Sequence, residues 1–125
     1  MGGAGAALSC SACHVPPTFA LDANARGIGL DAGESTVFKA PSLKNVGITG
    51  PYMHDGRFAT LDQVLQHYDN GIRVGPALDD RLRNGNGGVR PFNLSGADRS
   101  ALSAFLRTLS DSTLTTDPRF STPFR

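Results

Sequence analysis

The sequence has no excess of charge of one sign and no long hydrophobic run. Lysine and arginine together number 12, and aspartate and glutamate number 11, so the formal net charge is only +1. A net charge this small produces no strong electrostatic attraction to the phosphates of nucleic acid or to an anionic membrane surface. No apolar stretch approaches the roughly 20 residues that cross a bilayer. We therefore expect neither a nucleic-acid partner nor a membrane span.

Cysteine is scarce, and its placement excludes one common way of stabilising a small domain. The chain has two cysteines, Cys10 and Cys13. A pair this close in sequence closes no sizeable loop, so a disulfide scaffold is excluded. Residues 1–9 lack the basic and apolar segments of a signal peptide. We expect them to be a flexible N-terminal remnant, followed by one domain over 10–125.

Glycine and proline are abundant, with 15 and 8 residues in a chain of 125. A hydrophobic fraction of 39% argues against disorder throughout. So many loop-forming residues predict short helices joined by long connections. An irregular fold of this kind often needs a stabilising element besides its own hydrophobic core.

Two segments carry the signals of a helix. Thr60 with Gln63, and Ser95 with Asp98, have the spacing of a capping box. Apolar side chains at helical spacing follow each box: Leu61, Val64, Leu65 and Tyr68 after the first, and Leu102, Phe105, Leu106 and Leu109 after the second. These patterns predict helices over 61–70 and 95–110 in an all-α domain without paired strands. His67 is expected on the polar surface of the first helix.

The remaining C-terminal residues, 111–125, are polar and include two prolines. We expect them to form an extended tail. Phe120 and Phe124 are the side chains able to pin this tail to the body of the domain.

The segment Cys10-Ser11-Ala12-Cys13-His14 has the C-x-x-C-H pattern of c-type haem attachment. The two thiols can add to the vinyl groups of one porphyrin, and the adjacent histidine can reach its iron. Zinc is the alternative, since two cysteines and a histidine supply three of its four usual ligands. His54 or His67 would then be the fourth.

Haem iron has a second axial position, for which Met53 is the candidate. Met1 begins the chain, so Met53 is the only internal methionine. It lies in a loop between glycines and prolines, and a thioether ligand favours ferrous iron and a high potential. His54 is the competing ligand. Lys39, Lys44 and Arg57 flank this loop and are candidates for pairing with haem propionates.

Several longer segments resemble the C-terminal, electron-transfer haem domain of bacterial di-haem cytochrome c peroxidases, the group that includes MauG. The resemblance runs from Cys10 to about Phe124, and its most specific part is Gly50-Pro51-Tyr52-Met53-His54-Asp55-Gly56-Arg57-Phe58. Further matching segments are 38–46, 67–71, 102–109 and 117–121.

The resemblance implies a small c-type cytochrome domain, with a few short helices and long loops wrapped around one covalently attached haem. Cys10 and Cys13 would carry the thioether bonds, His14 would be the proximal ligand and Met53 the distal one. In MauG-like members a tyrosine replaces this methionine, so the presence of Met53 favours the peroxidase or plain electron-transfer branch of the family. The chain contains no second C-x-x-C-H, so the peroxidatic haem domain of the family is not represented.

The resulting expectation is a His14/Met53-ligated electron-transfer domain. The alternative is a haem peroxidase that reduces hydrogen peroxide, as the whole or a part of a di-haem enzyme. The implied partner is a small cytochrome or cupredoxin donor, or a second haem domain. Because c-type haem is attached outside the bacterial cytoplasm, the resemblance implies a periplasmic or otherwise exported protein.

Overall fold

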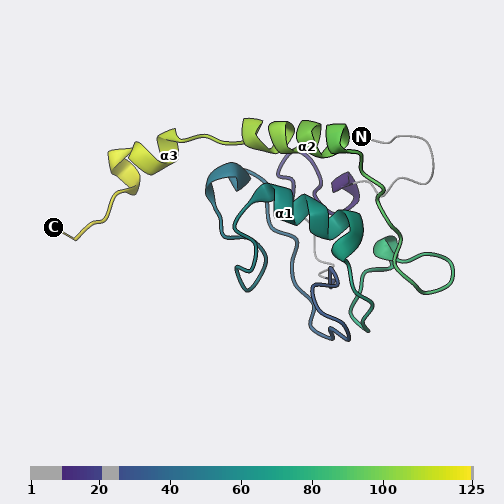
Figure 1. Cartoon of the computed structure of the whole chain (residues 1–125). Coiled ribbons are helices and arrows are strands. Elements are labelled where there is room, and N and C mark those ends of the chain that lie inside the picture. The colour runs from purple at the N-terminus through teal and green to yellow at the C-terminus, as the bar shows by residue number, and fades with distance from the viewer. Residues whose placement is uncertain (1–9, 21–25, 125) are drawn as a thin grey trace.

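The computed structural model describes residues 10–20 and 26–124, and its regular structure within them is helical (Figure 1). The described residues form no sheet, only isolated β-bridges such as Tyr52 with Phe58. The helical elements in chain order are η1 (Cys10–Ala12), η2 (Val46–Ile48), α1 (Leu61–Gln66), η3 (His67–Gly71), η4 (Asp80–Leu82), α2 (Gly96–Thr108), α3 (Thr113–Thr116) and η5 (Pro118–Phe120). The expected small domain of few short helices is therefore confirmed.

Helix α1 begins where the sequence predicts. The Thr60 hydroxyl accepts from the Gln63 backbone N–H, and the Gln63 side chain accepts from the Thr60 N–H, which completes the capping box. Leu61 and Leu65 are buried. After Gln66 the helix widens into η3, a single π-helical turn. Turns of this kind are rare and occur frequently at functional sites.

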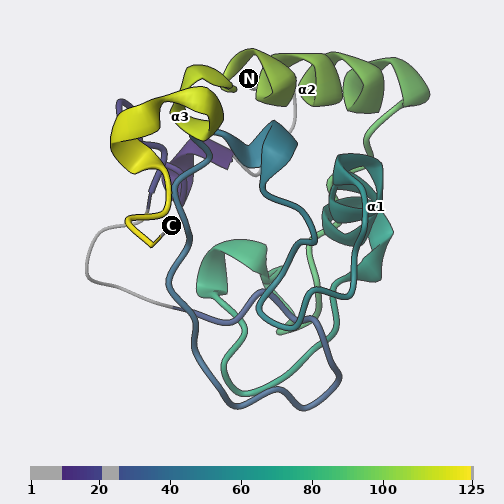
Figure 2. The ribbon, with the colours of Figure 1, turned by 90° about the vertical axis from the view of Figure 1, so that its left-hand side faces the viewer.

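Helix α2 is also confirmed, with Ser95 and Asp98 forming its capping box. It lies across one side of the body and packs against α1 and η2 (Figure 2). Its apolar stripe is only half-buried, and Phe105 makes an edge-to-face contact with Phe19 at 6.4 Å between ring centroids. The helix thus also contacts the loop that follows η1.

The core is small and is built largely from loop residues. Its centre is a cluster of Ile72, Leu78 and Leu82, against which Tyr68 and Phe92 pack among other partly buried side chains. No large side chain in the described part of the chain is completely enclosed. Long connections around a core of this size match the expectation drawn from the glycine and proline content.

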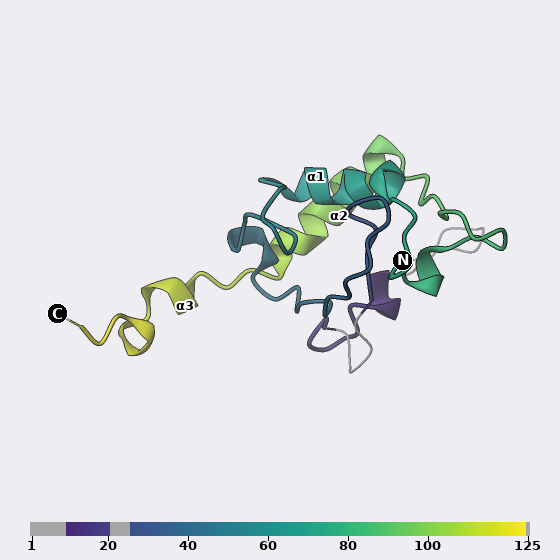
Figure 3. The same ribbon diagram turned by 90° about the horizontal axis from the view of Figure 1, so that it is seen from below.

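The C-terminal arm, residues 111–124, carries α3 and η5 and projects away from the body (Figures 1 and 3). Phe120 is 64% exposed and Phe124 is 84% exposed. The expectation that these side chains pin the tail to the body is therefore wrong. The arm is tied to the body at its root, where the Asp111 N–H donates to the Asn45 side chain.

Candidate functional site

The C-x-x-C-H segment forms one tight turn. Cys10–Ala12 is a 3₁₀ helix, and the Cys10 carbonyl accepts from the N–H groups of Cys13 at 3.2 Å and His14 at 2.8 Å. Side chains three residues apart eclipse each other on a 3₁₀ turn, so both thiols lie on the same side. The cysteines are half-buried and not joined to each other, and burial raises the pKa of each thiol.

His14 is oriented by two backbone carbonyls. Its Nδ1 lies 2.9 Å from the Phe19 oxygen and 3.1 Å from the Pro41 oxygen. Because carbonyls only accept, the proton is assigned to Nδ1, which leaves the Nε2 lone pair available to a metal. Fixing the tautomer through the other ring nitrogen is how proteins orient metal-ligating histidines.

Arg81, which is paired with Asp79, contacts the same turn from a segment far away in the sequence. Asp79 accepts two side-chain hydrogen bonds from Arg81, at 2.8 Å from Nε and 2.6 Å from Nη2. The remaining Nη1 donates to the Ala12 carbonyl at 2.6 Å. The sequence gives no sign of this contact, since nothing local relates Arg81 to a carbonyl 69 residues earlier.

Tyr68 lies near the two cysteines. Burial raises the pKa of its phenol, and the proximity of Cys13 and Cys10 raises it further. Its ring packs edge-on against Phe92 at 5.9 Å and against His67 at 5.5 Å. The sequence interpretation treated Tyr68 only as part of an apolar stripe. Nothing local in the sequence relates Tyr68 to the two cysteines more than 50 residues earlier.

Met53 lies in a tight loop before α1. It is half-buried and its backbone is left-handed, with φ of 73°. The Tyr52 N–H donates to the Phe58 carbonyl at 2.8 Å, which closes the loop, and the Tyr52 hydroxyl donates to Val46 at 2.7 Å. In Figure 1 this loop lies at the N-terminal end of α1, whereas η1 lies toward the opposite end.

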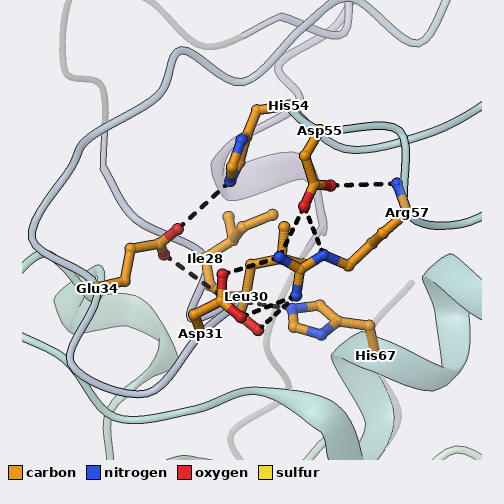
Figure 4. Close-up of polar contacts among 8 residues, drawn as sticks. All are labelled: Ile28, Leu30, Asp31, Glu34, His54, Asp55, Arg57 and His67. Atoms are coloured by element: carbon orange, nitrogen blue, oxygen red, sulfur yellow. Dashed lines mark hydrogen bonds and ion pairs between the residues drawn. The ribbon is translucent and has the colours of Figure 1, made fainter.

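His54, the competing iron ligand, is engaged on both sides (Figure 4). Its ring stacks on Phe38 with centroids 4.0 Å apart and planes 7° from parallel. Its Nε2 lies 3.7 Å from the Glu34 carboxylate. These contacts give His54 a local structural role.

Arg57 is also engaged, which bears on its candidacy as a propionate partner. Its guanidinium bonds to the carboxylates of Asp31 and Asp55 and to the Leu30 carbonyl (Figure 4). The bonds from Arg57 lower the pKa of both carboxyls. A propionate would have to displace one of these carboxylates, whereas Lys39 and Lys44 are exposed.

His67 is buried, so the expectation of a surface histidine is wrong. Its Nε2 donates to the Ile28 carbonyl at 3.0 Å, and burial lowers its pKa. The expectation assumed a regular α-helix through residue 70. The loop that contains Ile28, 39 residues earlier, packs over this position and supplies the carbonyl that the ring bonds.

The residues named for a zinc site do not come together. Among residues 10–20 and 26–124, no three His, Cys, Asp or Glu side chains converge closely enough to hold a metal ion. His67 donates to a carbonyl and His54 faces Glu34. In the same described part of the chain, no helix has the length and apolar character needed to cross a membrane.

Comparison with known sequences gives a family. The sequence profile of di-haem cytochrome c peroxidases matches residues 3–83. The methylamine utilization protein MauG of Methylorubrum extorquens is 36% identical over 115 residues, covering 80% of this chain and 30% of that protein. Cytochrome-c peroxidase IdrP2 of Denitromonas iodatirespirans is 39% identical over 83 residues, covering 66% of this chain and 20% of that protein.

A solved structure agrees with these relatives. A MauG-like protein associated with microbial copper homeostasis superposes with a TM-score of 0.70 and 31% identity, covering 97% of this chain and 48% of that chain. The chain thus spans about half of this relative and about a third of MauG. Sequence profile, relatives and fold lead to one conclusion: the chain belongs to the di-haem cytochrome c peroxidase and MauG family, whose function is haem-based redox chemistry.

Proposed function

We propose that this chain is a c-type haem domain for electron transfer, with Cys10 and Cys13 as the thioether attachments and His14 as the proximal ligand. The observation that carries the proposal is the orientation of His14, whose Nδ1 is satisfied by two carbonyls while Nε2 is available. Two thiols on one face of the adjacent turn complete a donor set that suits covalently held haem. The haem iron would supply one-electron redox chemistry, and the chain would hold it and limit access to it.

The sixth ligand has two candidates, which predict opposite redox behaviour. Met53 is the candidate from the sequence, and a neutral thioether would raise the potential. Tyr68 is the second candidate, since its half-buried side chain lies near both attachment cysteines. An anionic phenolate would stabilise ferric iron and lower the potential.

The second candidate function is that of a haem peroxidase acting on hydrogen peroxide. It is supported by relatives such as IdrP2, named a cytochrome-c peroxidase, at 39% identity. This function would require an iron position that opens to peroxide. In either case the proposed partner is a small redox protein or a second haem domain. The proposed location is the periplasm or another exported compartment.

The deciding experiment is the ferric absorption spectrum of the protein matured with c-haem attachment enzymes. A low-spin spectrum with a near-infrared Met-to-iron charge-transfer band, lost in Met53→Leu, would assign Met53. A spectrum that changes in Tyr68→Phe but not in Met53→Leu would assign Tyr68. Tyr52→Phe is the matched control, because its hydroxyl bonds to a backbone carbonyl. A high-spin spectrum would favour the peroxidase, and absence of haem would refute both functions.

A further inference from the structure

Three asparagines of the chain are followed directly by glycine: Asn70, Asn84 and Asn86. This dipeptide is chemically labile, because glycine has no side chain to shield its backbone nitrogen from the carboxamide that precedes it. The nitrogen can attack the asparagine side chain and expel ammonia, which leaves a five-membered succinimide ring. The structure holds the three asparagines in different ways, so we expect them to react at different rates.

Asn70 lies inside the π-helical turn η3, with its glycine as the last residue of the turn. Ring closure requires the asparagine backbone to rotate away from helical dihedral angles. The turn is tied to two other segments, which oppose this rotation. His67 donates to the Ile28 carbonyl at 3.0 Å, and the Asp69 carboxylate accepts from the Leu94 N–H at 2.8 Å. Asn70 is therefore held in an unreactive backbone conformation.

Asn84 is exposed to solvent, but its side chain makes three hydrogen bonds. Its Oδ1 accepts from the N–H groups of Asn86 at 3.0 Å and Gly88 at 2.8 Å. Its Nδ2 donates to the Val89 carbonyl at 3.3 Å. These bonds must break before the carboxamide can turn toward the nitrogen of Gly85. Asn84 therefore holds the loop 84–88 together and is itself protected.

Asn86 lies in the same loop, which projects from the body after η4 (Figures 1 and 3). Asn86 and Gly87 are both exposed. In the part of the chain that the structure describes, Asn86 makes hydrogen bonds only through its backbone. A Cβ built on Gly87 would meet nothing within 4 Å, so no atom packs over this side of the dipeptide. A single exposed turn hydrogen bond, from the Gly87 N–H to the Asn84 carbonyl at 3.1 Å, must open before the nitrogen attacks.

We propose that Asn86 is a deamidation site and is the first of the three asparagines to react. The Gly87 nitrogen bonds to Cγ of Asn86, the bond from Cγ to the side-chain nitrogen breaks, and that nitrogen leaves as ammonia with the proton from Gly87. Water then adds to either carbonyl of the succinimide and opens the ring. One opening gives aspartate, and the other gives isoaspartate, whose main chain runs through Cβ and Cγ. Water is the only co-reactant, and nothing is oxidised or reduced.

Both products change the loop. Each adds one negative charge, which cancels the formal net charge of +1. Isoaspartate also lengthens the main chain by one carbon between Asn84 and Gly88, whose N–H and carbonyl are joined at 2.8 Å. Small, polar residues at an exposed loop tip tolerate such a change without loss of the fold. The reaction involves none of Cys10, Cys13 and His14, so it does not depend on the proposed electron-transfer function.

The test is incubation of the full chain, matured with haem, at mildly alkaline pH, followed by trypsin digestion and mass spectrometry. Trypsin releases residues 84–90 as one peptide, and fragment ions separate Asn84 from Asn86. In the folded protein, Asn86 should deamidate at least about tenfold faster than Asn84 or Asn70, because only local opening exposes the other two. In a synthetic peptide of residues 81–90, which has no fold, Asn84 and Asn86 should react at similar rates. Far-UV circular dichroism establishes that the incubated protein remains folded.

Two matched variants locate the product independently. A methyltransferase that labels isoaspartate should find little substrate in incubated Asn86→Gln, whereas Asn84→Gln should remain a substrate. Equal rates at Asn84 and Asn86 in the folded protein would show that the hydrogen bonds of Asn84 give no protection, and would overturn the proposal. So would an unreacted Asn86 under conditions in which the peptide reacts, since the folded turn would then block the attack.

Discussion

Substituting Arg81 tests how the fold holds the haem-attachment turn. Arg81→Gln removes two charge-assisted hydrogen bonds to the buried Asp79 and one to the Ala12 carbonyl. A hydrogen bond to a charged group contributes about 1.5–3 kcal/mol. The Arg81 side chain is 37% exposed, so water replaces part of this. We expect the free energy of unfolding to fall by about 2 kcal/mol, or the Tm by about 6–8 °C.

Urea unfolding followed by far-UV circular dichroism measures this loss, since the chain has no tryptophan to report by fluorescence. Arg119→Gln is the matched control, because Arg119 pairs with Asp117 but makes no third hydrogen bond among the described residues, and this exposed pair should contribute little to stability. Hydrogen exchange at Cys13 and His14 should quicken in Arg81→Gln only. Equal stability of the two variants would refute the view that Nη1 of Arg81 tethers the turn.

Three further outcomes are expected. Burial lowers the pKa of His67, so protonating this side chain favours the unfolded state. The free energy of unfolding should therefore decline as the pH falls below about 6.5. Urea unfolding of His67→Gln should lack that part of the decline. Ser95→Ala should cost about 1 kcal/mol by removing the cap of α2, as measured in the same assay. Gly29→Ala should destabilise more than Gly33→Ala in thermal unfolding. Both glycines have positive φ, but a Cβ at Gly29 would lie 2.3 Å from a backbone oxygen, whereas Gly33 has open space.

Helix starts were predictable because their causes are local. The boxes at Thr60 and Ser95 each join groups three residues apart, so spacing alone specifies them. The continuation past Gln66 was not predictable in the same way. The helix widens into a π-helical turn there, and His67 makes a buried hydrogen bond to Ile28, 39 residues earlier, a partner that helical periodicity does not reveal.

The candidate site likewise has a part that the sequence predicts and a part that it does not. The attachment pattern of Cys10, Cys13 and His14 is contiguous, so the sequence by itself determined which side chains could serve a covalent haem. Membership of the family followed from longer contiguous motifs for the same reason. The assignment of Met53 remains a prediction.

Only the tertiary structure decided how these side chains are presented. It orients His14 through Pro41, 27 residues away, and ties Ala12 to Arg81, 69 residues away. It also brings Tyr68 near the two cysteines. Such pairs form only when loops with no periodicity of their own pack around a shared core. Packing is a property of the whole chain, so no local pattern encodes it.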